Sequence, residues 1–374
     1  MTATRRVIKE IGGLLWLIIS YIVPKSRRMA VISTYPDFDD TVRSLVPELE
    51  RAGIRVVILL HGHSRGRCPP WLSKTATVLP RYSLAAIWLY HRSATVFFTH
   101  GIFAFWKTGP KQTVVNLWHG MPLKVFNDLR PGASKARVHF SITIAHPAPF
   151  KPIIARAFSV PEEKVLIARH PRLDQMLTPE PFNLSLVSEK QRLCLWLPTY
   201  RRSSVGRGYS DGDERADPYH PTADLWDLDR VFGERGLICL VKPHPMAEAN
   251  GPVLEKYKNI IHIEEEVLRG GGITLYQLLG RCDYIITDFS SVYFDFIETG
   301  RNALLYCPDF DAYAANRGVV PEAYELVRHK ILRSQEELVR EVSAAVPPPY
   351  KPIIYDDGRN PITRKLLREL RLLS

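Results

Sequence analysis

Short apolar runs alternate with longer helix-like stretches along most of this 374-residue chain. Runs rich in β-branched residues are typical of strands, and strands that alternate with helices indicate parallel sheets covered on both faces. The expected strands are Met29–Thr34, Val56–Leu60, Thr95–Thr99, Thr113–Trp118, Ser141–Ala145, Val165–Ala168, Leu193–Leu197, Leu237–Lys242, Ile260–Ile263, Tyr284–Thr287 and Ala303–Tyr306. The sequence therefore predicts an α/β fold of two doubly wound, Rossmann-like domains facing a cleft.

The expected strands divide into two groups at the proline-containing stretch Thr178–Leu186. We expect an N-terminal helix in residues 1–28, a first domain in 29–180, a second in 181–345, and a tail with a closing helix, Arg359–Leu373, in 346–374. Ser203–Pro221 follows a strand and lacks an apolar period, so it is either a lid or a surface loop. Ligands of such sheets bind at the carboxyl ends of the strands, where functional side chains are expected.

The run Ile11–Val23 is apolar and has basic residues on both sides. It is shorter than the roughly 20 residues of a spanning helix, and it ends in Pro24-Lys25 rather than in a small-residue cleavage site. We expect a helix in the headgroup region of an anionic membrane, with Trp16 and Tyr21 at the interface. A helix buried against the protein, an export signal and a true anchor are the alternatives.

The charge balance indicates an anionic partner, because the chain has 50 Lys and Arg residues and 39 Asp and Glu residues, which gives a net charge of +11. Nucleic acid is not expected, because aromatic ribonucleoprotein motifs and basic tracts interleaved with stacking residues are missing. The cysteines are widely spaced and predict reduced core residues: Cys68, Cys194, Cys239, Cys282 and Cys307.

Two histidines follow expected strands on constrained turns. His119 lies in Trp118-His119-Gly120-Met121-Pro122-Leu123-Lys124, and a pKa near neutrality suits a histidine there to accept a proton from a hydroxyl. His244 lies between two prolines in Lys242-Pro243-His244-Pro245, where the lysine adds a positive charge suited to a diphosphate. A purely structural histidine is the alternative for His119.

Two further strand ends carry groups that bind anions. Thr199 and Arg201 follow the strand Leu193–Leu197, and an arginine there either binds phosphate or only caps the surface. Asp288, Ser290 and Ser291 follow the strand Tyr284–Thr287, where the serines either cap a helix or bind an anion. For Asp288 and Asp295 a structural role is favoured over a role in metal binding, because no dense acidic cluster surrounds them. No metal or cofactor is expected.

These motifs, with Pro171-Arg172-Leu173-Asp174, resemble in their order the CDP-glycerol glycerophosphotransferases of teichoic-acid and capsule synthesis, over about Met29–Arg340. The resemblance implies a two-domain glycosyltransferase B fold, His119 as the catalytic base, and His244, Ser290 and Ser291 on the donor's phosphates. The wider predicted substrate-binding set is Lys124, Arg172, Thr199, Arg201, Lys242 and Asp288. Arg169-His170 stands where the family commonly has a glycine, and the missing extra domains of long polymerases favour a single-addition or short-chain enzyme.

The resemblance further implies transfer of glycerol phosphate from CDP-glycerol, or of a related polyol phosphate from its CDP-polyol, with release of CMP. The implied acceptor is a hydroxyl of a polyprenyl-diphosphate-linked glycan at the cytoplasmic face of the membrane. A CDP-ribitol ribitolphosphotransferase and a nucleotide-sugar glycosyltransferase of the same fold are the alternative enzymes. A membrane-bound scaffolding protein is the alternative outside the enzymes, but it has no need of a base that works near neutral pH.

Overall fold

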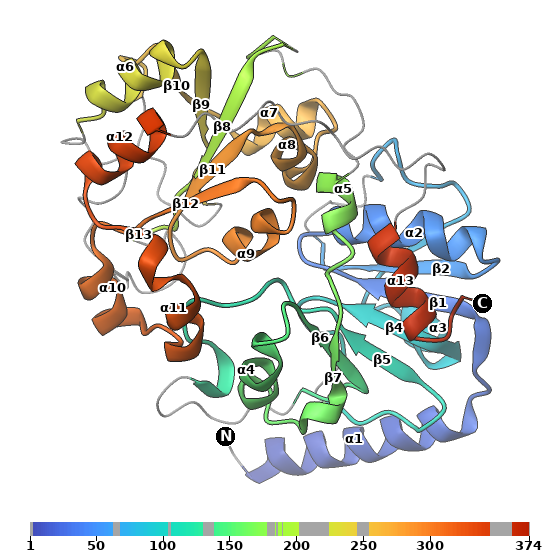
Figure 1. The fold of residues 1–374 in the computed structure, drawn as a ribbon. Helices are drawn as coiled ribbons and strands as arrows, with labels where there is room; N and C mark the ends of the chain where they lie inside the picture. Colours follow the sequence, from blue (N-terminus) through green and yellow to red (C-terminus); the bar gives the residue numbers. More distant parts are fainter. Residues whose placement is uncertain are drawn as a thin grey trace. The chain divides into compact units, whose positions relative to one another are not determined.

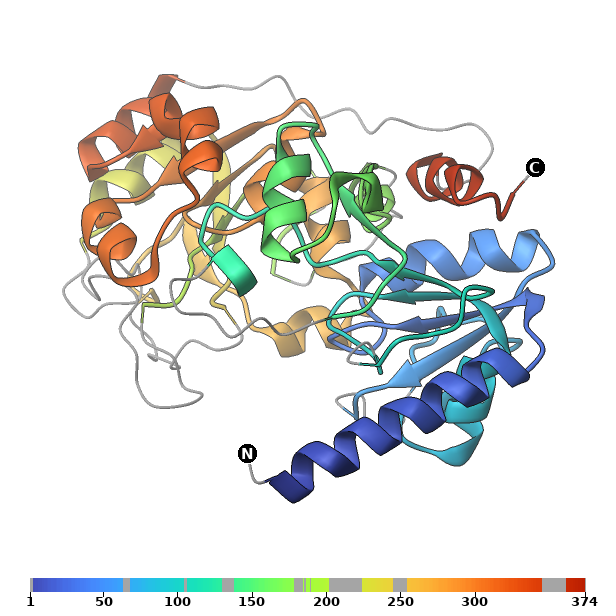
Figure 2. The same ribbon diagram turned by 90° about the horizontal axis from the view of Figure 1, so that it is seen from below.

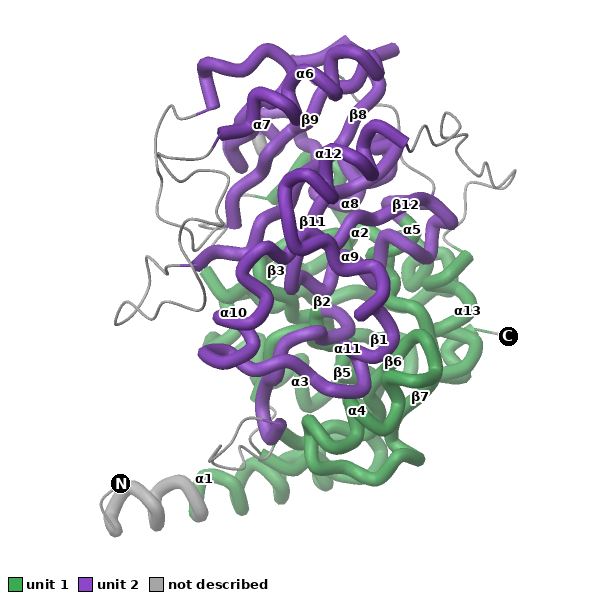
Figure 3. Tube along the Cα trace, turned by 60° about the vertical axis from the view of Figure 1, so that its left-hand side comes forward, with its two compact units in different colours: residues 1–119, 131–174, 355–374 green, residues 120–130, 175–354 purple. Residues whose placement is uncertain are grey.

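The computed structural model describes residues 3–62, 68–103, 106–129, 138–177, 184, 186–188, 190–201, 224–244, 254–344 and 361–373. The predicted loop Ser203–Pro221 and most of the predicted break at Thr178–Leu186 lie outside these residues. The chain forms two compact units, unit 1 with residues 1–119, 131–174 and 355–374, and unit 2 with residues 120–130 and 175–354 (Figure 3). The sequence analysis places a single passage between the domains near residue 181, whereas the chain also enters unit 2 directly after His119.

Unit 1 contains a parallel sheet in the order β3-β2-β1-β4-β5-β6-β7 (Figure 1). Its strands are β1 (Ser26–Ser33), β2 (Arg55–Leu60), β3 (Thr77–Pro80), β4 (Ser93–Phe98), β5 (Thr113–Asn116), β6 (Ile142–Ala145) and β7 (Val165–Ile167). The order runs outward from β1 in both directions, which is the doubly wound arrangement predicted from the sequence. The sequence analysis missed the edge strand β3, which is short and ends in a proline.

Helices cover both faces of this sheet. The helical segments of unit 1 are α1 (Ala3–Ile22), α2 (Asp40–Arg51), α3 (Leu84–Arg92), α4 (Phe150–Ala157), η2 (Glu162–Lys164) and α13 (Pro361–Glu369), and α5 (Leu173–Leu177) lies at its boundary. Ile32 of β1 packs in the apolar cluster that includes α2 and α13, whereas its neighbour Val31 packs in the cluster that includes α1 and α3. The alternation of side chains along a strand therefore supplies two cores, one on each face. The predicted closing helix is α13.

Unit 2 contains a second parallel sheet, in the order β10-β9-β8-β11-β12-β13. Its strands are β8 (Arg192–Leu197), β9 (Leu237–Val241), β10 (Ile260–His262), β11 (Tyr284–Thr287), β12 (Asn302–Tyr306) and β13 (Ile331–Leu332). The helical segments are η1 (Asn127–Leu129), α6 (Trp226–Glu234), α7 (Glu265–Gly270), α8 (Leu275–Arg281), α9 (Val292–Ile297), α10 (Phe310–Arg317), α11 (Pro321–Val327), η4 (Arg328–Lys330) and α12 (Gln335–Ala344). The two-residue strand β13 was not predicted. The predicted fold class is confirmed, with one parallel sheet in each unit.

Helix α1 runs beside the sheet of unit 1 (Figure 2), and its side chains form two different faces. Trp16 is buried and contacts the rings of Tyr90, Phe103 and Trp106, and the Ser20 hydroxyl accepts a hydrogen bond from the Gly109 amide at 2.7 Å. The prediction that Trp16 lies at a membrane interface is therefore wrong, because this side chain anchors the helix to the unit. The other face exposes apolar side chains, namely Ile11, Leu14, Leu15, Ile18, Ile19, Tyr21 and Ile22. No helix within the described ranges is long and apolar enough to cross a bilayer.

The cysteines are free thiols. Cys194, Cys239, Cys282 and Cys307 are buried in unit 2, as predicted for reduced core residues. Cys68 is exposed, so the prediction is wrong for that residue. Its run, Arg67-Cys68-Pro69-Pro70, is polar and rich in proline and gave no apolar pattern for a core position.

Candidate active site

His119 lies in unit 1 on a turn that follows β5. Asn116, the last residue of the strand, accepts a hydrogen bond from the Trp118 amide on its side-chain oxygen at 3.1 Å. Trp118 then adopts a left-handed conformation with φ of 58°, which is uncommon for a bulky side chain, and Gly120 has φ of 128°, which suits glycine. Strained backbone of this kind persists where surrounding contacts fix it, and it is concentrated at functional sites.

His170 and Arg172 supply those contacts by holding two carbonyl groups of the turn. His170 Nδ1 accepts a hydrogen bond from the Arg172 amide at 3.2 Å, so its Nε2–H donates to the Trp118 carbonyl, also at 3.2 Å. Arg172 donates from its guanidinium to the His119 carbonyl at 3.0 Å. Burial, followed by the charge of Arg172, holds the pKa of His170 well below its ordinary value, so its ring is neutral. Arg172 was predicted to bind substrate, and its described contact is with the backbone of the candidate base.

Two aromatic side chains contact the His119 ring. The His100 imidazole is stacked on it with centroids 4.5 Å apart, and the Trp118 indole lies at 3.7 Å with the planes inclined by 37°. His100 Nδ1 lies 3.0 Å from the Thr99 hydroxyl. Burial lowers the pKa of His100 to about 4, with smaller contributions from His61 and Arg172. His100 is therefore neutral near pH 7, and its π face is available to a cationic His119.

Sequence reasoning missed His100 and also His61, which follow the predicted strands Thr95–Thr99 and Val56–Leu60 directly. The rule that led to His119 and His244, to look at the residue after each strand, would have found both. Each is also followed directly by a glycine with positive φ, as His119 is, so the turn signal was present at His61-Gly62 and at His100-Gly101 as well.

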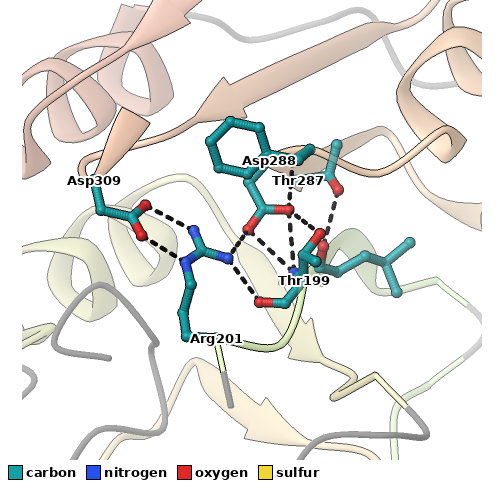
Figure 4. Close-up of polar contacts among 7 residues, drawn as sticks. Thr199, Arg201, Thr287, Asp288 and Asp309 are labelled. Carbon is teal, nitrogen blue, oxygen red and sulfur yellow. Dashed lines mark hydrogen bonds and ion pairs between the residues drawn. The ribbon is translucent and has the colours of Figure 1, made fainter. Parts of the chain in front are cut away.

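Unit 2 holds the second group of predicted site residues. Arg201 is almost fully buried. Its Nε and one terminal nitrogen donate to the Asp309 carboxylate at 2.7 and 2.8 Å (Figure 4). Its other terminal nitrogen donates to Asp288 at 2.8 Å and to the Thr199 carbonyl at 2.7 Å. Asp288 also accepts from the Thr199 amide at 3.1 Å and from its hydroxyl at 2.5 Å. These contacts tie the loops after β8, β11 and β12 together. The geometry favours an indirect role for Thr199, Arg201 and Asp288, as groups that position a site, and Asp309 is the member of this network that sequence reasoning missed.

Lys242 and His244 follow β9 as predicted. Lys242 is buried, and its Nζ lies 2.7 Å from a carboxylate oxygen of the half-exposed Glu265. The His244 ring lies 4.9 Å from the ring of Tyr200, centroid to centroid. Desolvation lowers the pKa of His244 to about 4, and the charges of Lys124 and Lys242 contribute. His244 is therefore a neutral imidazole near the ammonium groups of Lys124 and Lys242, of which the second is paired with Glu265, and the Asp288 carboxylate also acts on it.

Lys124 belongs to unit 2 although it lies in the same sequence motif as His119. Its segment pairs with the chain before α11: Val125 donates its amide to the Gly318 carbonyl at 3.1 Å, and Val320 donates to the Leu123 carbonyl at 2.8 Å. Gly318 has φ of 83°, and a Cβ there would lie 2.7 Å from a methyl group of Val125. Glycine thus permits the close approach that fixes Lys124 in the unit that contains His244.

Ser290 and Ser291 precede the six-residue helix α9, also in unit 2. The Ser290 hydroxyl accepts a hydrogen bond from the Val292 amide at 3.4 Å, whereas the Ser291 side chain makes no capping bond. Asp295 of this helix accepts a hydrogen bond from the Tyr276 hydroxyl. The serines are thus at the end of β11 as predicted, and the contact of Asp295 agrees with the structural role favoured for it.

The comparisons with known proteins agree with these motifs. The family model for CDP-Glycerol:Poly(glycerophosphate) glycerophosphotransferase matches residues 16–349. A teichoic acid ribitol-phosphate primase of Bacillus spizizenii is 22% identical over 92% of this chain and 89% of the relative. A teichoic acid poly(glycerol phosphate) polymerase of the same organism is 26% identical over 71% of this chain and 69% of the relative.

Solved structures are similar to this chain in fold. One of the wall teichoic acid polymerase TagF, from a variant soaked with CDPG, has a TM-score of 0.64 at 17% identity and covers 93% of this chain and 83% of that chain. A UDP-GlcNAc 2-epimerase of Methanocaldococcus jannaschii has a TM-score of 0.54 at 13% identity and covers 92% of this chain and 99% of that chain. At these identities the structures establish the fold alone, but the family model spans most of the sequence. The chain therefore belongs to the CDP-glycerol:poly(glycerophosphate) glycerophosphotransferase family.

Proposed function

We propose that this protein transfers glycerol phosphate from CDP-glycerol to a hydroxyl of a lipid-linked glycan or polymer acceptor in teichoic-acid or capsule-type polymer synthesis, releasing CMP. Family membership supports the reaction class. The observation that carries the proposal is the neutral His244 beside Lys124 and Lys242 in unit 2, because a nucleotide diphosphate needs such a cationic site with hydrogen-bonding capacity. Ser290 and Ser291 complete the proposed donor site, which Thr199, Arg201 and Asp288 hold in place.

In the proposed reaction His119 is the general base. The acceptor oxygen attacks the glycerol-side phosphorus in line, the bond between that phosphorus and the CMP oxygen breaks, CMP takes the electron pair, and His119 accepts the hydroxyl proton. The clamp that His170 and Arg172 form on the His119 turn supports this role, since a base must be held within hydrogen-bond reach of the proton it removes. The cationic side chains stabilise the charge on the transferred phosphoryl group.

The identity of the polyol is the finer part of this proposal. The two curated relatives described above are named for ribitol phosphate and for glycerol phosphate, so CDP-ribitol is the first alternative donor. A nucleotide sugar is the second, because a UDP-GlcNAc 2-epimerase shares the fold. Incubating the purified protein with labelled CDP-glycerol, CDP-ribitol and several nucleotide sugars tests all three. Consumption of a nucleotide sugar without release of CMP from either CDP-polyol would overturn the proposal.

We further propose that the protein works at the cytoplasmic face of the membrane, on a polyprenyl-diphosphate-linked acceptor. The exposed apolar face of α1 supports contact with a membrane, and α3, which contacts α1 through Trp16, adds exposed Leu84 and Trp88. Arg27 and Arg28 are exposed just after the helix and suit anionic headgroups. An amphipathic helix of this kind lies in the interface rather than across the bilayer.

A further inference from the structure

A row of side chains lies along the carboxyl end of the unit 1 sheet and leads away from His119. Its order is Arg81, His61, Tyr35, His100 and His119, following β3, β2, β1, β4 and β5, and this is also the order of those strands in the sheet. Ring centroids are 6.0 Å apart for His61 and Tyr35, 5.3 Å for Tyr35 and His100, and 4.5 Å for His100 and His119. The row is therefore continuous and ends at a guanidinium.

The guanidinium of Arg81 is held in place before any ligand arrives. It donates to His61 Nδ1 at 2.7 Å and to the Tyr82 hydroxyl, and it lies 4.4 Å from the centroid of the Tyr82 ring. Because Arg81 can only donate, His61 Nδ1 is the acceptor and its Nε2–H faces the Ser33 hydroxyl at 3.0 Å. His61 is thus locked in one neutral tautomer, and Arg81 keeps its positive charge.

We propose that Arg81 binds a phosphate of the acceptor, a phosphodiester or diphosphate that lies well back from the hydroxyl presented to His119. This inference rests on the proposed function for the identity of the reacting hydroxyl. Neighbouring strands are about 4.8 Å apart, so four steps along the sheet separate Arg81 and His119 by roughly 19 Å. An acceptor laid along the row would meet the edges of the stacked His119 and His100 rings, then the exposed Tyr35 ring, and finally a preorganised fork for phosphate oxygens.

Binding of defined acceptor fragments tests the proposal without requiring transfer. The probes are a fluorescent penta(glycerol phosphate), the single-unit glycerol phosphate, and an uncharged oligoglycerol ether of the pentamer's length. Replacing Arg81 with Gln should weaken pentamer binding about tenfold to a hundredfold, the loss expected for one charge-assisted contact. Binding of the uncharged ether and of the single unit should stay as in the wild type. Arg81→Lys, which keeps the charge without the fork, should lie between.

Arg55→Gln is the matched control, because Arg55 is an exposed arginine at the opposite end of β2 in the same sheet. It should bind every probe as the wild type does. The proposal is overturned if Arg81→Gln binds the pentamer as tightly as the wild type, or if it loses the charged and uncharged chains equally. It is also overturned if Arg81→Gln loses only binding to phosphatidylglycerol vesicles, since the guanidinium would then serve a lipid headgroup. CDP-glycerol consumption by the same preparations reports separately on the proposed function.

Discussion

The imidazole rings of His100 and His119 lie almost parallel, 4.5 Å apart between centroids and inclined by 10°. His100 is neutral near pH 7 because burial lowers its pKa to about 4. In the proposed reaction His119 accepts a proton, and the imidazolium that would form faces the π system of a neutral ring rather than a second positive charge. The stack is therefore suited to stabilise protonated His119 without adding repulsion.

Replacing His100 with Ala should lower kcat about tenfold and leave the KM for the donor within about twofold, because a stack of this kind contributes on the order of 1 kcal/mol. The acid limb of the kcat profile should move to lower pH by about half a unit to one unit, since protonated His119 loses its stabilising neighbour. His100→Phe keeps an aromatic face, so it should return the acid limb most of the way to its wild-type pH. An unmoved acid limb in His100→Ala would show that His100 acts only in folding.

His170 holds the turn by donating to the Trp118 carbonyl and accepting from the Arg172 amide. His170→Ala should lower the free energy of unfolding by about 1–3 kcal/mol, because it leaves buried groups without partners, and it should lower kcat because Trp118 is no longer held in its strained conformation. His170→Gln places a donor near the position of Nε2 and His170→Asn an acceptor near that of Nδ1. If the Trp118 contact is the important one, kcat should recover more in the Gln variant than in the Asn variant. Urea unfolding of both variants checks that they are folded. Equal recovery of kcat in the two variants would contradict a special role for the Trp118 contact.

The parts of the site that depend on local sequence could be predicted. His119, Lys242 and His244 follow buried strands and are flanked by glycine or proline, so strand prediction and turn chemistry together indicated them. The role of Arg201 could not be predicted, because its partners Asp288 and Asp309 lie about a hundred residues away and only the fold brings them to it. In the sequence, a polar residue at a strand end that contacts a ligand looks the same as one that only holds neighbouring loops together.

The same distinction holds for the fold. Parallel sheets were predictable because the strands are buried on both faces and continuously apolar. The face of α1 that packs on unit 1 was not predictable. A run that is apolar all round has no helical period to indicate that Trp16 rather than Tyr21 is buried. The passage of the chain into unit 2 directly after His119 was also hidden, since it depends on the close approach of Gly318 to Val125.

Arg201→Ala should destabilise the protein by about 3–5 kcal/mol, because it leaves the buried carboxylates of Asp288 and Asp309 without their counter-ion. Donor binding should weaken together with stability. Lys242→Ala is the comparison, since its partner Glu265 is half exposed and can be solvated. That variant should weaken donor binding with a loss of stability below about 1 kcal/mol. Urea unfolding and donor titration of both variants check the pair, and weakened donor binding in a fully stable Arg201→Ala would instead indicate direct phosphate contact.

The exposed face of α1 should bind anionic vesicles. The double change Leu14→Glu and Ile18→Glu places two carboxylates one turn apart on that face, where both side chains are largely exposed. Binding to vesicles of phosphatidylglycerol and phosphatidylcholine should fall at least tenfold. Two apolar side chains no longer insert into the bilayer, and the anionic headgroups repel the two new carboxylates. Leu326→Glu, at an exposed leucine of α11, is the control and should bind as the wild type does. Undiminished sedimentation of the double variant with vesicles would exclude this face as the membrane contact.

The C-terminal helix α13 is held in unit 1 by a carboxylate that titrates. Asp174 is fully buried and accepts hydrogen bonds from the Ile362 and Thr363 amides at 3.0 and 2.8 Å and from the Thr363 hydroxyl at 2.6 Å. Desolvation raises its pKa from 3.8 to about 6, and the nearby Glu48 adds to the increase, whereas the hydrogen bonds oppose it. The folded protein therefore binds this proton more tightly than the unfolded chain does.

This pKa fixes the sign of a pH dependence. A raised pKa in the folded state contributes stability that is fully present below pH 4 and is lost as the pH rises to about 6, by up to about 3 kcal/mol for a shift of roughly two units. Asp174→Asn cannot titrate, so the advantage of the wild type over this variant in urea unfolding should shrink between pH 4 and pH 7. Carboxyl groups that do not act on Asp174, such as the buried Asp39, titrate in both proteins and cancel in the difference. A difference that stays constant with pH would mean that Asp174 is ionised throughout, with its three donors outweighing the desolvation.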